Sequence, residues 1–151
     1  MSPTSLEDDL VRATSTLYAE FSKYTYAGKD FCTFCYSSDD ILEITTTPIR
    51  ELSSEAASKL LWEVSDHWES ADVYRHYLPR FLEIMGPPWN VEDTFEEHIF
   101  YTLRGVGFDT WPEGERSAVL GYLRALKPFL ALSDDELEGW TTAYTDLAER
   151  A

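Results

Sequence analysis

Both cysteines of the chain lie in one short aromatic segment, Phe31-Cys32-Thr33-Phe34-Cys35-Tyr36. Two residues separate Cys32 from Cys35, a spacing at which one loop can supply two thiolates to a tetrahedral zinc ion. A single CxxC pair also fits a redox-active dithiol, or two ordinary small residues in an aromatic-lined loop. The sequence leaves these three interpretations open.

The missing two zinc ligands could be His76 and His67, and His98 is another candidate. Asp72 stands four residues before His76, and Glu63 four before His67. On helices, each carboxylate could therefore accept the second ring N–H of its histidine, as partners of metal-bound imidazoles do. The candidate ligand set is Cys32, Cys35, His76 and His67, and zinc is the one cofactor that the sequence suggests.

The redox interpretation depends on the residues that follow Cys35. Ser37 and Asp40 have the spacing of a capping box, so a short helix is expected directly after Cys35, and its positive end favours a thiolate. Asp39 and Asp40 oppose that charge. A thioredoxin-like motif also follows a strand in a βαβ unit, which this sequence does not predict.

Other catalytic patterns are absent from the sequence. A di-iron bundle carries Glu three residues before its histidines, whereas Val64, Val73 and Phe95 hold those positions here. There is no HExxH, no nucleophile elbow and no phosphate-binding glycine loop. We therefore favour a non-catalytic protein; the alternative is a metal- or thiol-dependent enzyme acting through Cys32, Cys35 and His76.

The composition is strongly acidic. Twenty-eight acidic residues against twelve basic ones give a net charge of −16. Such a surface repels nucleic-acid phosphates and anionic membranes, and it attracts basic proteins. We expect a basic protein partner, no direct contact with nucleic acid and no membrane association. The same acidity also fits a role in solubility or an acidic habitat.

The N-terminus carries no apolar segment of the signal-peptide type, and the longest uncharged apolar runs are too short for a membrane span. We therefore expect a cytoplasmic protein whose thiols are reduced.

Hydrophobic residues recur at helical spacing along most of the chain. Leu6, Leu10, Leu17 and Phe21 predict a first helix over about 5–26 that Gly28 stops. Further helices are expected over about 37–45, 53–68, 70–86 (with Pro79 inside), 90–106, 111–128 and 133–150. Residues 1–5 are expected to be disordered. The fold class is all-α: a single domain, residues 1–151, with six or seven helices packed mostly as antiparallel neighbours.

Charged and aromatic residues outside the cysteine segment favour structural roles. Arg75 is expected to pair with Asp72 or Glu69, although Arg75 and Arg80 also form a basic spot in an acidic chain. Trp111, Trp140 and Trp89 are expected in the core, the alternative being an exposed aromatic patch for a partner.

Three segments resemble a group of uncharacterised bacterial proteins. They are the cysteine turn after the first helix, Thr47-Pro48-Ile49-Arg50-Glu51-Leu52, and the stretch from Asp72 to Glu83, which reads DVYRHYLPRFLE. The group shares a "TPLREL-like" link and an Asp-Phe-x-His-Phe-Leu-Pro-Arg core. The resemblance covers about residues 20–86 and implies a bacterial origin, but no activity. The group's turn has one more cysteine than this chain, and His67 lies outside its pattern.

Overall fold

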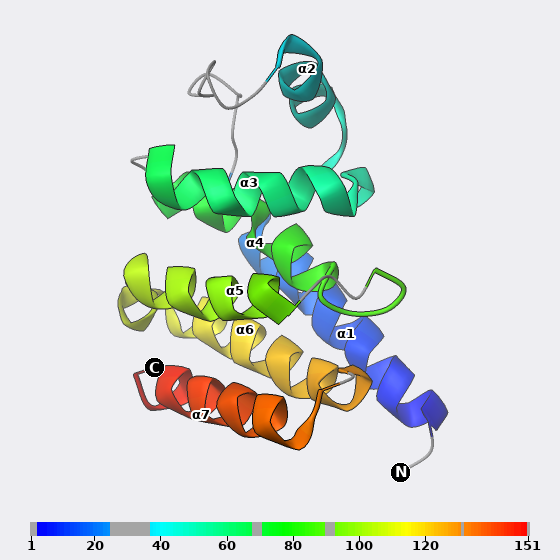
Figure 1. Ribbon diagram of the computed structural model, residues 1–151, viewed down its shortest axis with the longest axis vertical. Coiled ribbons are helices and arrows are strands. Elements are labelled where there is room, and N and C mark those ends of the chain that lie inside the picture. The colour runs from blue at the N-terminus through cyan, green and yellow to red at the C-terminus, as the bar shows by residue number, and fades with distance from the viewer. Residues whose placement is uncertain (1–2, 25–36, 68–70, 90–92, 131, 151) are drawn as a thin grey trace.

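The computed structural model describes residues 3–24, 37–67, 71–89, 93–130 and 132–150 (Figure 1). Within these ranges the chain forms seven α-helices and three short 3₁₀ helices, and no strand. The predicted all-α class is therefore confirmed.

The seven α-helices of the described ranges are numbered in chain order. Their bounds are α1 Pro3–Phe21, α2 Ser38–Thr46, α3 Ser54–His67, α4 Ala71–Glu83, α5 Asp93–Gly105, α6 Glu113–Leu126 and α7 Asp134–Arg150. The 3₁₀ helices are η1 Ile49–Glu51, η2 Phe108–Thr110 and η3 Lys127–Phe129.

The helices stack in layers. In Figure 1, α2 lies above α3, and α5, α6 and α7 run back and forth beneath them, as expected for antiparallel neighbours. Helix α1 crosses this stack obliquely and packs on α6 and α4, while α3 packs on α4 and α5 and α5 packs on α7.

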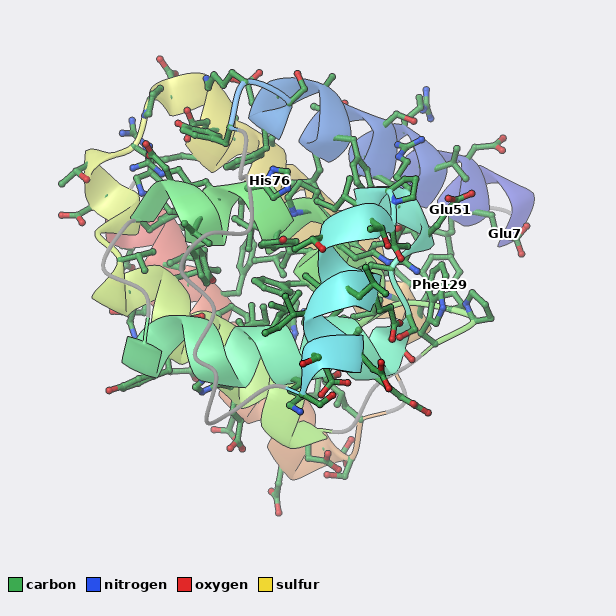
Figure 2. The ribbon with its side chains drawn as sticks, turned by 90° about the horizontal axis from the view of Figure 1, so that it is seen from above. Glu7, Glu51, His76 and Phe129 are labelled. Atoms are coloured by element: carbon green, nitrogen blue, oxygen red, sulfur yellow. The ribbon has the colours of Figure 1, made fainter. Side chains whose placement is uncertain are left out.

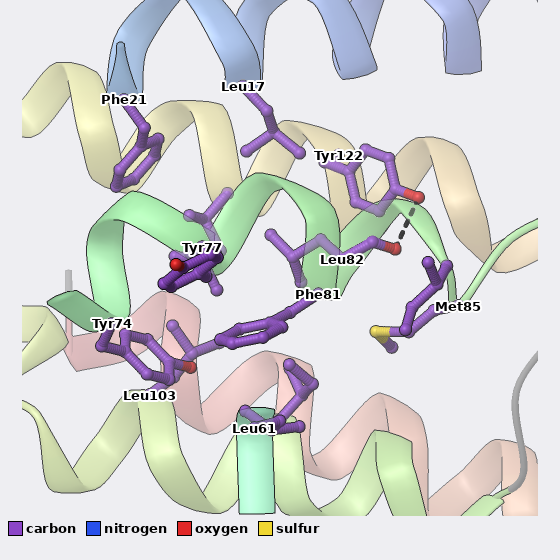
Figure 3. Close-up of a cluster of buried hydrophobic side chains, with 14 of the residues drawn as sticks. Leu17, Phe21, Leu61, Tyr74, Tyr77, Phe81, Leu82, Met85, Leu103 and Tyr122 are labelled. Carbon is purple, nitrogen blue, oxygen red and sulfur yellow. Dashed lines mark hydrogen bonds between the residues drawn. The ribbon is translucent and has the colours of Figure 1, made fainter. Parts of the chain in front are cut away.

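Helix α4 is the central helix of the core. Tyr74, Tyr77, Phe81 and Leu82 of α4 are all buried (Figure 3). Other core residues shown there are Leu17 and Phe21 of α1, Leu61 of α3, Leu103 of α5 and Tyr122 of α6. The sequence predicted one apolar face for this helix. The buried residues from Tyr77 to Leu82 instead surround it, as in a helix packed on several sides.

The capping box predicted at Ser37 and Asp40 is present, and the start of α7 has a second one. Ser37 and Asp40 cap α2 reciprocally, and Ser133 and Glu136 cap α7 in the same way. Each box satisfies backbone donors that a helix start leaves unpaired, so both helices begin where the sequence predicts.

Helix α1 differs from its prediction at both ends. It begins at Pro3, so residues 3–5, where we expected disorder, lie in its first turn. It ends at Phe21 rather than near residue 26. There the Ser22 hydroxyl donates to the Ala19 carbonyl at 2.9 Å, and the Tyr24 amide donates to the Phe21 carbonyl at 3.1 Å. These bonds close α1 with a tight turn. Gly28, the predicted stop, lies outside the described residues.

The exposure of three aromatic side chains separates core from surface. Trp111 and Trp140 are buried, as the core interpretation predicts, whereas Trp89 is 37% exposed. Leu137 of α7 is also 37% exposed. Among the described residues, no helix combines the length and apolarity that crossing a bilayer requires.

Candidate functional site

The structure describes the surroundings of one of the four predicted zinc ligands. Cys32 and Cys35 lie outside the described residues. His67 ends α3, but its side chain also lies outside the description. The four-residue set therefore stays a prediction. Within the part of the chain that is described, no three His, Cys, Asp or Glu side chains gather as metal ligands would.

His76 lies on α4 beside the end of α1 (Figure 2). Its Nδ1 is 2.8 Å from the backbone carbonyl oxygen of Tyr24. Because a carbonyl only accepts, Nδ1 carries the proton, and in the neutral ring the remaining lone pair is on Nε2. A carbonyl partner of this kind orients many metal-binding histidines. The proposed outer partner, Asp72, instead approaches Arg75 at 4.0 Å.

Tyr24 also anchors a group of charged and aromatic side chains around the buried carboxylate of Glu115. We call Lys23, Tyr24, Arg75, Trp111 and Glu115 the Glu115 cluster. The side chain of Glu115 is fully buried, and its Oε2 accepts a 2.6 Å hydrogen bond from the Tyr24 hydroxyl. Lys23 Nζ lies 2.9 Å from the same oxygen. The cluster thus joins the end of α1 to the first turn of α6.

Arg75 completes the cluster from α4. One of its guanidinium nitrogens donates to the Tyr24 hydroxyl at 2.8 Å and lies 3.9 Å from Glu115 Oε1. Its guanidinium carbon lies 5.2 Å from the ring centre of Tyr24 and 4.7 Å from that of Trp111. The predicted pair with Asp72 forms at 4.0 Å, but the buried partners Tyr24 and Glu115 were not predicted.

Burial and hydrogen bonding shift the titration of two cluster members. Burial, followed by the hydrogen bond to Glu115, raises the pKa of Tyr24, and Arg75 partly opposes that rise. The contact with Glu115 raises the pKa of Lys23. Both groups are therefore held in the protonated forms that donate to Glu115. A carboxylate paired with two cations and a phenol in this way serves best as a structural anchor.

The sequence carried a signal for Glu115 that we did not use. Glu115 precedes the buried Val119 by four residues and the buried Tyr122 by seven. It therefore falls on the apolar face of α6, where an acid requires buried partners.

Arg80 lies in a second interior polar group. It is 4% exposed, its Nε donates to the Leu52 carbonyl at 2.8 Å, and a terminal nitrogen lies 2.5 Å from Glu83 Oε1. The Tyr18 hydroxyl donates to the same Glu83 oxygen at 2.7 Å. Together with the buried position of Arg75, this shows that the basic spot seen in the sequence belongs largely to the interior.

A surface groove runs between α5 and α7. Two adjoining hollows of about 420 and 700 Å³ share Arg104, Asp135, Gly139 and Ala143. Phe100, Leu132, Trp140 and Ala143 form its apolar lining. Its acidic residues are Glu97, Asp135, Glu136, Glu138 and Asp146. We call this feature the α5–α7 groove; among the described residues that line it, Arg104 is the only basic one.

No family model, curated protein or solved structure matches the chain. The resemblance to the bacterial group therefore stays an expectation, and the functional argument rests on the chain's own residues.

Proposed function

We propose that this chain is a non-catalytic, acidic helical module that binds a basic partner protein. The observation that carries the proposal is the α5–α7 groove, in which five carboxylates surround an apolar lining. The chain as a whole is also negatively charged, with a net charge of −16. An acidic field of this kind accelerates encounter with a basic protein and disfavours phosphate-rich nucleic acids.

The buried polar groups support a binding role over a catalytic one. Arg75 and Glu115 hold helices together, and Arg80 ties α4 to the Leu52 carbonyl. Their charges are used inside the fold, so the chain's surface is left with its excess of acids for intermolecular contacts.

The test is the salt dependence of binding to an identified partner. Crosslinking in the source cells, followed by mass spectrometry and purification of the captured basic protein, supplies that partner. Its Kd is then measured at ionic strengths of about 0.1 M and about 1 M, between which the Debye length falls from roughly 10 Å to roughly 3 Å. We expect affinity to fall at least tenfold. Equal affinity at both ionic strengths contradicts the proposal.

We also propose that Cys32, Cys35 and His76 hold a structural zinc ion, with His67 as the further candidate ligand. The supporting observation is the Nδ1 bond of His76 to the Tyr24 carbonyl, since Cys32 follows Tyr24 by only eight residues. Bound zinc would supply folding free energy by joining this segment to α4.

Metal analysis of untagged protein, purified without chelators, tests the zinc proposal. We expect about one zinc per chain, lost in a Cys32→Ser/Cys35→Ser double variant together with thermal stability. His76→Asn provides a finer test, because its side-chain N–H can still reach the Tyr24 carbonyl while Nε2 is gone. Undiminished zinc in His76→Asn removes His76 from the ligand set. Metal-free folded protein with rapidly alkylated thiols favours the alternative of a thiol-dependent enzyme.

A further inference from the structure

The α5–α7 groove combines an apolar lining with an acidic rim. Trp140 and Phe100 contact edge-to-face with ring centres 5.8 Å apart, and Tyr144 stacks on Trp140 at 5.6 Å. These contacts hold the indole in place. A long basic side chain suits such a surface, because its methylene stem can lie on the rings while its charged head reaches the rim.

Arg104 shows how a guanidinium lies in this groove. It extends from α5 and lines both hollows, and its terminal nitrogen is 3.7 Å from Asp146 Oδ2 on α7. The groove thus already holds one arginine head between its two helices. Asp135 and Glu138 are exposed on the same stretch of α7 and provide carboxylates for further heads.

The shape of the lining favours a peptide over a free cation. Trp140 is 6% exposed and lines the groove, and its indole Nε1 is closed off from solvent. A bound segment therefore meets the ring of Trp140 rather than its N–H group. Long basic side chains can cover the rings and reach the carboxylates together, whereas a free cation can reach only the carboxylates.

We propose that the α5–α7 groove binds an arginine-rich segment of the basic partner, with guanidinium groups on Asp135, Glu138 and Glu97 and methylene stems on the aromatic lining. Arginine is preferred to lysine because its planar fork matches a carboxylate with two parallel hydrogen bonds. This inference rests on the proposed function and names the site and chemistry of its partner.

The experiment uses the whole chain and an octa-arginine peptide as the probe, with octa-lysine for comparison. Kd is measured by calorimetry for the wild type and two triple variants. The groove variant is Glu97→Gln/Asp135→Asn/Glu138→Gln. The control variant, Asp39→Asn/Glu51→Gln/Glu55→Gln, removes three exposed acids from α2, η1 and α3, away from α7 in Figure 1. Asp39 and Glu55 lie in first helical turns, as Asp135 does, so the two variants lose similar helix-end charges.

We expect the groove variant to bind octa-arginine about tenfold more weakly, since three rim contacts of a few-fold each are lost, and the control variant to change by less than about threefold. The indole N–H resonance of Trp140, assigned with Trp140→Phe, is expected to shift when the peptide covers the ring. Octa-lysine is expected to bind more weakly than octa-arginine.

Equal losses of affinity in the two triple variants would contradict the groove as the binding site. The proposal that charge attracts a basic partner would still stand. An unmoved Trp140 resonance at saturation would likewise place the peptide elsewhere. Failure of the proposed function has a different outcome, namely octa-arginine and partner affinities that do not respond to salt in any variant.

Discussion

The Tyr24 hydroxyl donates a 2.6 Å hydrogen bond to Glu115 Oε2, joining residues 91 positions apart in the chain. The same hydroxyl accepts from Arg75 at 2.8 Å, and the backbone carbonyl of Tyr24 accepts from His76. Tyr24, just after the end of α1, therefore connects α1 to α4 and to α6.

Replacement of Glu115 by glutamine should destabilise the protein strongly. The amide has the same shape, but it leaves the guanidinium of Arg75, which is 17% exposed, facing a neutral group at a buried position. Removing one partner of a buried ion pair costs about 3 kcal/mol or more. Urea unfolding followed by far-UV circular dichroism measures the change. A variant as stable as the wild type would show that Glu115 carries no net charge interaction.

Tyr24→Phe should cost about 2 kcal/mol or more in unfolding free energy, because the hydroxyl loses its hydrogen bonds with both Glu115 and Arg75 while the ring remains. Tyr101→Phe is the matched control, since Tyr101 is 63% exposed and should change stability by less than about 0.5 kcal/mol. Equal effects of the two substitutions would contradict the anchoring role of Tyr24.

Arg80→Lys tests whether the interior arginine needs the several N–H donors of its guanidinium group. Lysine cannot donate both to the Leu52 carbonyl and to Glu83 in the observed geometry, so we expect a loss of about 2 kcal/mol. Arg124→Lys, at an exposed position of α6, should change stability by less than about 0.5 kcal/mol. Thermal and urea unfolding of both variants provide the comparison. A tolerated Arg80→Lys would mean that charge alone suffices there.

Alkaline pH should unfold the protein through its buried phenols. Burial raises the pKa of Tyr74, Tyr122 and Tyr18 above their ordinary value near 10. A group whose pKa is raised by folding contributes stability below its unfolded pKa, and this contribution is lost as pH rises toward the folded pKa. Each such phenol should lower the unfolding free energy by about 1.4 kcal/mol per pH unit above about pH 10.

Urea unfolding at several pH values, with phenolate absorbance recorded in parallel, measures that slope. Tyr74→Phe should make the slope of unfolding free energy against pH shallower by the contribution of one phenol. A wild-type slope no steeper than that of Tyr74→Phe would show that Tyr74 already ionises freely in the native protein.

Arg104→Gln should strengthen the binding of octa-arginine about two- to threefold. The substitution removes the Arg104–Asp146 ion pair and takes a positive charge out of the groove. The ion pair is exposed and 3.7 Å long, so stability should change by less than about 1 kcal/mol. Calorimetric titration is the measurement. Weaker binding would indicate that Arg104 itself contacts the peptide backbone.

The sequence predicted most helices well because local signals determine their ends. The Ser37 and Ser133 caps are four-residue patterns, and the extended Thr47 before Pro48 follows from local sterics. The end of α1 was missed because it depends on contacts with distant residues. Tyr24 turns toward Glu115 on α6, and no local pattern at residues 21–24 specifies that partner.

The candidate site was harder to predict than the fold. The role of His76 as a zinc ligand stays a prediction, and the observed partner of its Nδ1 is a backbone carbonyl, which leaves no mark in the sequence. The α5–α7 groove was missed for a related reason. Its acids come from two helices whose pairing depends on tertiary packing, so the sequence shows only an overall excess of acids.

The packing of α1 on α6 also has a consequence for biosynthesis. About ninety residues separate Tyr24 from Glu115, so α1 is translated well before its principal partner exists. Synthesis proceeds at about 5–20 residues per second, so the apolar face with Leu17 and Phe21 stays without α6 for at least several seconds. Long-range closure of this kind also slows folding relative to bundles whose contacts are local. The nascent first helix is therefore the stretch of this protein that most needs protection from aggregation before synthesis is complete.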